Sequence, residues 1–171
     1  NLANVYTDME DFDRAEELYE RAVNGPGTSN TAHSNLVRAR LLQGDLEGAR
    51  AALAAFEAAH PEDPGVQEGG FWVHAWAGEW SEAEAVIAGW EANPELPFVY
   101  RVNAHEHRAQ VATARGRIGE ARREIDQARE LAEAEFGPGE GWFYALYAAY
   151  LERVTGNTAR ARELVDAVED G

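Results

Sequence analysis

His105 and His107 come nearest, by residue type and spacing, to the ligands of a metal ion, with Glu106 between them. Side chains two residues apart on a helix point in different directions, so these two imidazoles are badly placed to share one ion. A zinc-protease helix carries its histidines four residues apart. The chain also has no cysteine, which removes thiolate ligands and cysteine nucleophiles. The sequence therefore predicts no metal site and no cofactor.

Pairs of carboxylates could serve acid–base catalysis, and Glu16 with Glu20 and Glu120 with Glu124 are two such pairs. That chemistry needs a closed, water-poor pocket in which the pKa values shift. Carboxylates at this spacing are instead typical of the solvated face of a helix. The glycine-rich segment 137–141 lacks the Lys-Ser/Thr of a phosphate-binding loop and indicates a connector between helices. We expect no catalytic residue, and we predict that the chain is not an enzyme.

Trp72, Trp76 and Trp80 recur every four residues, which places them along one side of a helix and its following turn. We expect Trp80 to anchor that turn in the core. Trp72 and Trp76 have two interpretations. They are aromatic anchors for a bound partner, or they pack against neighbouring helices. The sequence leaves both interpretations open.

The elements that position these residues follow an internal repeat. A six-residue pattern ending in alanine recurs, as in Gly44–Ala49 (GDLEGA) and Gly78–Ala83 (GEWSEA). Its alanines, Ala15, Ala49, Ala83, Ala121 and Ala161, are separated by 34, 34, 38 and 40 residues. A period of 34 is that of a helix–turn–helix repeat. The two longer steps require insertions, which we place around residues 91–97 and 133–139.

Each of these alanines begins an apolar stripe at helical spacing. Apolar side chains stand four and seven residues later, as Leu53 and Phe56 do after Ala49. The small alanine lets two helices approach closely, and the preceding glycine ends the first helix because it tolerates a positive φ. The predicted helices cover residues 2–9, 11–24, 30–43, 45–59, 64–77, 79–92, 97–115, 117–136, 140–155 and 157–169.

This pattern resembles the tetratricopeptide repeat family across essentially the whole chain. In the first pair, consensus places of that family are occupied by Leu2, Ala3, Tyr6, Ala15 and Tyr19. The resemblance implies an all-α solenoid of helix–turn–helix repeats, wound as a right-handed superhelix from about five helix pairs. We expect a single array with repeats at about 1–27, 28–62, 63–96, 97–137 and 138–171.

The resemblance also implies a binding surface. In the family, the first helices of the pairs line a concave groove that takes an extended peptide or a helix of a partner protein. Carried onto this sequence, the partner-binding places fall on Asn4, Asn35, Arg38, Trp72, Trp76, Asn103, Gln110 and Tyr150. One family subset clamps carboxylates with two asparagines and basic residues. Here Gly65 and Gly69 stand at basic places, so we expect no such clamp.

The net charge of −16 argues against binding to nucleic acids and to anionic membranes, because like charges repel. No apolar run approaches the roughly 20 residues that span a bilayer, so we predict no membrane insertion and a cytoplasmic location. The chain begins at Asn1 without an initiator Met and inside a helical pattern. We therefore expect it to be a fragment of a longer chain.

Two functions remain in competition at this point. The first is a non-catalytic scaffold that binds a peptide or partner helix in its concave groove. The alternative is an oligomerisation or spacer segment of a larger multidomain regulator. Residues 142–151 are apolar nearly all round and would supply an end face for a twin subunit or another partner. The groove hypothesis predicts a working concave surface, and the alternative predicts self-association through an end face.

Overall fold

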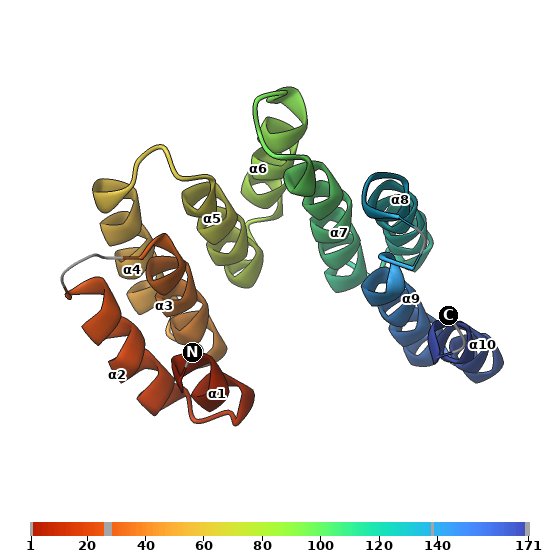
Figure 1. The fold of residues 1–171 in the computed structure, drawn as a ribbon, viewed down its shortest axis with the longest axis horizontal. Helices are drawn as coiled ribbons and strands as arrows, with labels where there is room; N and C mark the ends of the chain where they lie inside the picture. Colours follow the sequence, from red (N-terminus) through yellow and green to blue (C-terminus); the bar gives the residue numbers. More distant parts are fainter. Residues whose placement is uncertain (1, 26–28, 138, 170–171) are drawn as a thin grey trace. The chain divides into compact units, whose positions relative to one another are not determined.

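The computed structural model describes residues 2–25, 29–137 and 139–169. These described residues form ten α-helices and contain no β-strand (Figure 1). The helices are α1 (Leu2–Asp8), α2 (Phe12–Val23), α3 (Asn30–Leu42), α4 (Leu46–Ala59), α5 (Pro64–Ala77), α6 (Trp80–Ala92), α7 (Phe98–Ala114), α8 (Ile118–Phe136), α9 (Trp142–Val154) and α10 (Thr158–Glu169). The predicted all-α repeat fold is confirmed, and each predicted helix end lies within two residues of the observed one.

The contacts of the chain divide it into two compact units, Asn1–Val86 and Ile87–Gly171, which we call the N-terminal unit and the C-terminal unit. The boundary falls inside α6. In the N-terminal unit, α3 packs on both α2 and α4, and α5 packs on α3 and α4. In the C-terminal unit, α8 lies between α7 and α9, and α9 packs in turn on α10. Each helix therefore packs mainly on its neighbours in sequence, as a repeat array does.

Aspartates begin several of these helices. The Asp45 carboxylate accepts a hydrogen bond of 2.9 Å from the backbone N–H of Gly48, and the Asp63 carboxylate accepts one of 2.7 Å from Gly65. These bonds satisfy donors that the first turn of a helix leaves without an intrahelical partner. Pro64 follows Asp63 at the start of α5, where its missing N–H costs nothing.

The turn inside each helix pair uses a left-handed residue. This residue stands five positions before the repeat alanine and is Glu10, Gly44, Gly78, Gly116 or Gly156, with φ of 59°, 78°, 74°, 72° and 87°. The left-handed conformation bends the chain from the first helix into the second and is favoured in glycine, which has no Cβ. The first pair adopts the same turn with a glutamate.

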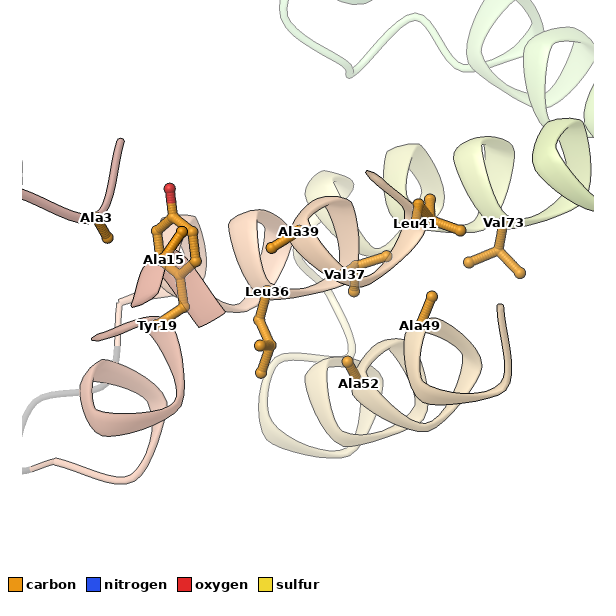
Figure 2. Close-up of a cluster of buried hydrophobic side chains, with 10 residues drawn as sticks. All are labelled: Ala3, Ala15, Tyr19, Leu36, Val37, Ala39, Leu41, Ala49, Ala52 and Val73. Atoms are coloured by element: carbon orange, nitrogen blue, oxygen red, sulfur yellow. The ribbon is translucent and has the colours of Figure 1, made fainter. Parts of the chain in front are cut away.

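The repeat alanines lie where the helices approach most closely, and we call them the packing alanines. Ala15, Ala49, Ala83 and Ala121 have no exposed surface, and Ala161 is 7% exposed. Figure 2 shows the core of the N-terminal unit, where side chains of α2, α3, α4 and α5 form one buried cluster. Any larger side chain at a packing alanine would push two backbones apart.

The insertions lengthen helices as well as the connecting loops. α5 and α6 have 14 and 13 residues, whereas α7 has 17 and α8 has 19. We expected the extra residues around 91–97 and 133–139, yet most of the first insertion adds about one turn to α7. A helical extension keeps its backbone hydrogen bonds internal, whereas a longer loop would leave them to water.

Candidate functional site

A polar cavity of about 170 Å³ opens between α1, α2 and α3 in the N-terminal unit. Three of the predicted binding residues line it: Asn4 on α1 and Asn35 and Arg38 on α3. Asn4 and Arg38 are exposed, and Asn35 is half-buried. The structure thus brings together three side chains that are up to 34 residues apart in sequence.

A hydrogen-bond network fixes the asparagines of this cavity. The hydroxyl of Tyr19 on α2 donates to Asn4 Oδ1 at 2.7 Å, and Asn35 Nδ2 donates to the same oxygen at 3.4 Å. Thr7 Oγ1 lies 3.3 Å from the Tyr19 hydroxyl. Because Asn4 Oδ1 is already used twice as an acceptor, the side-chain N–H groups of Asn4 remain to donate to a ligand.

Three residues that line this cavity, Thr7, Tyr19 and Ala39, were not predicted as site residues, and Tyr19 is the one that holds Asn4. It stands on the apolar stripe of α2 and is only 3% exposed, as a core residue would be. A buried tyrosine hydroxyl needs a hydrogen-bond partner, however, and that requirement is the signal that could have placed Tyr19 beside a polar residue. Figure 2 shows its hydroxyl projecting beyond the apolar cluster.

Arg38 belongs to an electrostatic group that continues onto α5. Partial burial raises the pKa of the Glu68 carboxyl, while the Arg38 guanidinium and a hydrogen bond from Trp72 act in the opposite direction. Glu68 therefore links the polar cavity to the first of the two predicted tryptophans. A ligand that contacts Arg38 would also change the environment of Glu68.

The two tryptophans of α5 have different surroundings. Trp72 is half-buried, packs against the buried cluster of the N-terminal unit and lies edge-on to Phe71, with 5.1 Å between ring centroids. Trp76 is 50% exposed. The large apolar area offered by Trp76 is the kind that a bound partner would cover. Trp72 is held mainly by the core and by Glu68.

Gly65 and Gly69 are both buried on the side of α5 that packs on α3 and α4. A Cβ on Gly69 would lie 2.9 Å from Leu53 Cδ1, and one on Gly65 would lie 3.1 Å from Ser34 Oγ. These positions therefore lack room for the basic side chains of a carboxylate clamp, which agrees with the expectation from the sequence.

In the C-terminal unit the predicted residues are spread along α7 and α9. Asn103 and Gln110 are half-buried, and Tyr150 is 53% exposed. Gln110 Nε2 donates to Glu106 Oε1 at 3.1 Å, while the backbone of Asn103 hydrogen-bonds the imidazole of His107. The ring of Tyr150 lies 6.2 Å from that of Tyr147.

Glu106 influences the neighbouring tyrosines of α9. Burial raises the pKa of Tyr144 to about 12, and the charge of Glu106 adds to this shift. Burial also raises the pKa of Tyr147, against a hydrogen bond with Thr113 that lowers it. Both phenols therefore stay protonated and neutral at physiological pH, and this surface presents hydroxyl donors and a carboxylate.

His105 and His107 diverge as their spacing predicts. His105 Nδ1 lies 2.8 Å from Glu124 Oε2, whereas His107 is 3% exposed and sits edge-on to Trp90 with 5.2 Å between ring centroids. Among the described residues, no group of three or more His, Asp or Glu side chains could hold a metal ion. None of the described helices is long and apolar enough to cross a bilayer.

Comparisons with known proteins identify the fold. The tetratricopeptide repeat family model matches residues 1–28, which is the first helix pair. A thermophilic tetratricopeptide repeat protein of Thermus thermophilus superimposes with a TM-score of 0.70 at 19% identity, covering 99% of this chain and 87% of that chain. No curated protein sequence matches the chain.

Two further solved structures are similar over the same length. A putative kinesin light chain of Podosopora anserina with nearly identical TPR-like repeats gives a TM-score of 0.57 at 20% identity, covering 99% and 90% of the two chains. BtubC (BKLC) from P. vanneervenii gives 0.61 at 13% identity, covering 99% and 76%. At these identities the likeness shows the fold, and the expected resemblance to tetratricopeptide repeats is confirmed.

Proposed function

We propose that this chain, which carries the tetratricopeptide-repeat fold, is a non-catalytic scaffold whose first helices bind a peptide or helix of a partner protein. The observation that carries the proposal is the polar cavity between α1, α2 and α3. There, Asn4, Asn35 and Arg38 come together beside the buried hydroxyl of Tyr19. Fold alone does not determine function, so the proposal depends on this surface.

The chemistry of this cavity suits a polypeptide ligand. Asparagine amides can donate to and accept from the peptide groups of an extended segment, whatever its sequence. The exposed Arg38 guanidinium adds a cation that would favour an acidic side chain or a carboxylate in the partner. The hydrogen bonds around Asn4 hold the amides before a ligand arrives, which lowers the ordering cost of binding.

The test uses the immobilised chain and one matched pair of charge reversals. Arg38→Glu changes the cavity, whereas Arg21→Glu makes the same charge change on the exposed surface of α2, outside the cavity. Proteins captured from a lysate of the source organism would be identified by mass spectrometry and then titrated by calorimetry. Both variants should keep the far-UV circular dichroism of the starting chain.

The expected result is a partner that binds the unchanged chain and the Arg21→Glu variant alike and binds Arg38→Glu at least tenfold more weakly. Equal affinity for all three chains would contradict the proposed cavity. A partner affected equally by both reversals would indicate general repulsion by this acidic protein, and that result would also contradict it.

The alternative function is an oligomerisation or spacer segment. The observation that favours it is the exposed aromatic surface of α9, where Trp142, Phe143 and Tyr150 are 53%, 47% and 53% exposed. This alternative expects a dimer or larger assembly in solution. Light scattering of the chain over a hundredfold range of concentration would separate it from a monomeric scaffold.

A further inference from the structure

A surface with one carboxylate and several aromatic rings lies where side chains of α9 pack over α7 in the C-terminal unit. We call it the α7–α9 surface and define it by Glu106, Gln110, Thr113, Tyr144, Tyr147 and Tyr150. The three residues on α7 share one side of that helix, because they are spaced by four and three residues. Tyr144 and Tyr147 pack on a buried cluster that includes Ala109 and Ala112 of α7. All six residues belong to the C-terminal unit, so one compact unit positions them.

The polar half of this surface is a carboxylate held by an amide. Gln110 Nε2 donates to Glu106 Oε1 at 3.1 Å, which fixes the direction of the carboxylate. The other end of the amide, Gln110 Oε1, is buried and has no hydrogen-bond partner among the described residues. This negative end of the amide dipole adds to the charge of Glu106. Because a carboxylate has about four acceptor sites, Glu106 can accept from a ligand as well as from Gln110.

The aromatic half of the surface consists of the three tyrosine rings of α9. Tyr144 and Tyr147 are half-buried and Tyr150 is 53% exposed, so each ring keeps area that a ligand can reach. The ring centroids of Tyr147 and Tyr150 lie 6.2 Å apart, and the two rings are inclined by 44°. The faces of neutral aromatic rings are negative and attract cations. The carboxylate and the rings therefore favour the same sign of charge in a ligand.

The N-terminal unit shows which group a carboxylate and an aromatic ring hold together on this fold. Glu68 stands fifteen residues before the packing alanine of its pair, as Glu106 does. Partial burial raises the pKa of the Glu68 carboxyl, while the Arg38 guanidinium and a hydrogen bond from Trp72 lower it. A guanidinium, a carboxylate and an aromatic side chain therefore come together there. The repeat place of Arg38 is held in α7 by the neutral Gln110, so that place adds no cation to the α7–α9 surface.

We propose that the α7–α9 surface binds an arginine side chain of a partner protein, with the guanidinium on the Glu106 carboxylate and against the rings of Tyr147 and Tyr150. This contact depends on the proposed function, in which the first helices are the surface that a partner covers. It adds the chemistry of one contact, which lies outside the polar cavity of the N-terminal unit. The partner is therefore a polypeptide with a basic segment.

Arginine suits this surface better than other charged groups do. Its planar guanidinium has five donors, stacks on aromatic faces and is more weakly hydrated than the ammonium group of lysine. A carboxylate or phosphate of a partner would be repelled by Glu106. Arg153, three residues after Tyr150, lines a depression on the side of α9 that faces α10. The net charge of −16 on the whole chain favours the approach of a basic segment.

The probe for this contact is N-acetyl-arginine methylamide, which carries the side chain between two peptide groups. It would be titrated into the 171-residue chain while NMR follows the tyrosine ring signals. The corresponding citrulline compound has nearly the same shape without the charge, and the corresponding lysine compound has the charge without the planar group. The protein variants are Glu106→Gln and Tyr147→Leu. Their matched controls are Glu135→Gln, at an exposed carboxylate of α8, and Tyr147→Phe, which keeps the ring.

We expect saturable shifts of the Tyr147 and Tyr150 signals with the arginine probe. The citrulline compound should bind about tenfold more weakly, and the lysine compound about threefold more weakly. Glu106→Gln should weaken the arginine probe about tenfold, whereas Glu135→Gln should leave its affinity unchanged. Tyr147→Leu should weaken the probe about threefold, and Tyr147→Phe should not, because the ring face attracts the cation.

Absence of saturation, with circular dichroism showing every chain to be folded, would overturn the proposed contact. Equal affinity for the citrulline and arginine compounds would also overturn it, because the surface would then recognise shape rather than charge. Equal weakening by Glu106→Gln and Glu135→Gln would assign the binding to the general field of this acidic protein and contradict the contact as well. The capture experiment with Arg38→Glu tests the polar cavity separately, so failure of one contact is distinguishable from failure of the other.

Discussion

The α2–α3 junction of the N-terminal unit and the α8–α9 junction of the C-terminal unit are the same contact with the charges exchanged. In the first, Glu16 on the second helix meets Arg40 on the incoming helix. In the second, Arg122 on the second helix meets Glu152 on the incoming helix. The repeat geometry determines which two positions are in contact, and the sequence determines which of the two carries the positive charge and which the negative charge. Charge therefore distinguishes one stacking junction from another without any change of backbone.

The two junctions also differ in how deeply the arginine is held. Arg40 is 18% exposed and contacts Glu16, Glu20 and the carbonyl oxygen of Gly48. Burial by itself lowers the pKa of Arg40, but the hydrogen bonds and charges of the two glutamates raise it further than burial lowers it. Arg122 is 40% exposed and contacts Glu152 and Thr155. The N-terminal junction should therefore depend more strongly on its arginine.

The largest expected effect concerns the apolar residue seven positions after the packing alanine. The pair of α3 and α4 fills this place with Phe56 and the pair of α7 and α8 fills it with Ala128, and neither residue has exposed surface. Phe56→Ala should remove a buried ring and lower the free energy of unfolding by about 3–5 kcal/mol. Urea denaturation followed by circular dichroism measures this loss.

The control for this variant is Met9→Ala, which truncates a 67% exposed side chain and should change stability by less than about 0.5 kcal/mol. A loss below about 1 kcal/mol for Phe56→Ala would mean that the N-terminal unit closes around the vacant space. The contrast between a ring in the pair of α3 and α4 and a methyl group in the pair of α7 and α8 would then have little effect on stability.

The next effect is a dependence on pH that originates in the C-terminal unit. Burial lowers the pKa of His107 from an ordinary 6.5 to about 4. Between these values the unfolded chain binds the proton and the folded chain does not, so stability is complete above pH 6.5 and falls as the pH decreases to 4. The loss should reach up to about 3 kcal/mol.

Urea titrations at about pH 7, 6, 5 and 4 would measure this loss, and His107→Leu should make the curve distinctly flatter. In the N-terminal unit, burial and the nearby His60 also lower the pKa of His33, so some dependence of the same sign should remain in the variant. If His107→Leu leaves the slope of the free energy of unfolding against pH unchanged, other titrating groups cause the dependence on pH.

Removal of the arginine at either junction should have a smaller effect. Arg40→Ala should cost about 2 kcal/mol because it leaves two partly buried glutamates without their cation, and Arg122→Ala should cost about 1 kcal/mol because its site is more exposed. Double-mutant cycles with Glu16→Ala and Glu152→Ala measure the coupling in each pair. Equal coupling energies at both junctions would contradict the expectation that the more deeply buried arginine contributes more to stability.

The smallest effect compares the turns of the pairs. Glu10 adopts the left-handed conformation that glycine adopts in the other four pairs. Glu10→Gly should therefore stabilise the chain by about 1 kcal/mol, and Gly44→Ala should destabilise it by a similar amount. Thermal melting of both variants measures these changes. A destabilising Glu10→Gly would show that unfolded-state entropy outweighs the conformational strain.

The sequence alone was sufficient for the repeat architecture. The packing alanines, the turn residues before them and the apolar residues after them predicted ten helices with ends within two residues of those observed. This was possible because each helix of a repeat array packs mainly on its neighbours, so the pattern that forms a helix also states which side it buries. The places of Asn4, Asn35 and Arg38 in the repeat also put them on first helices, and the structure has all three lining the polar cavity; that they bind a partner stays a prediction.

Only the tertiary structure decided how individual side chains are used. Tyr19 has the sequence position of a core residue, yet its hydroxyl supports Asn4 on another helix. Trp72 has the position of a binding residue, yet the core and Glu68 hold it. The exchanged ion pairs join residues 24 and 30 positions apart. Such contacts depend on how far one helix is rotated about its axis relative to the next, because a step of one residue turns the direction of the side chain by about 100°. The apolar period of a single helix does not determine that rotation.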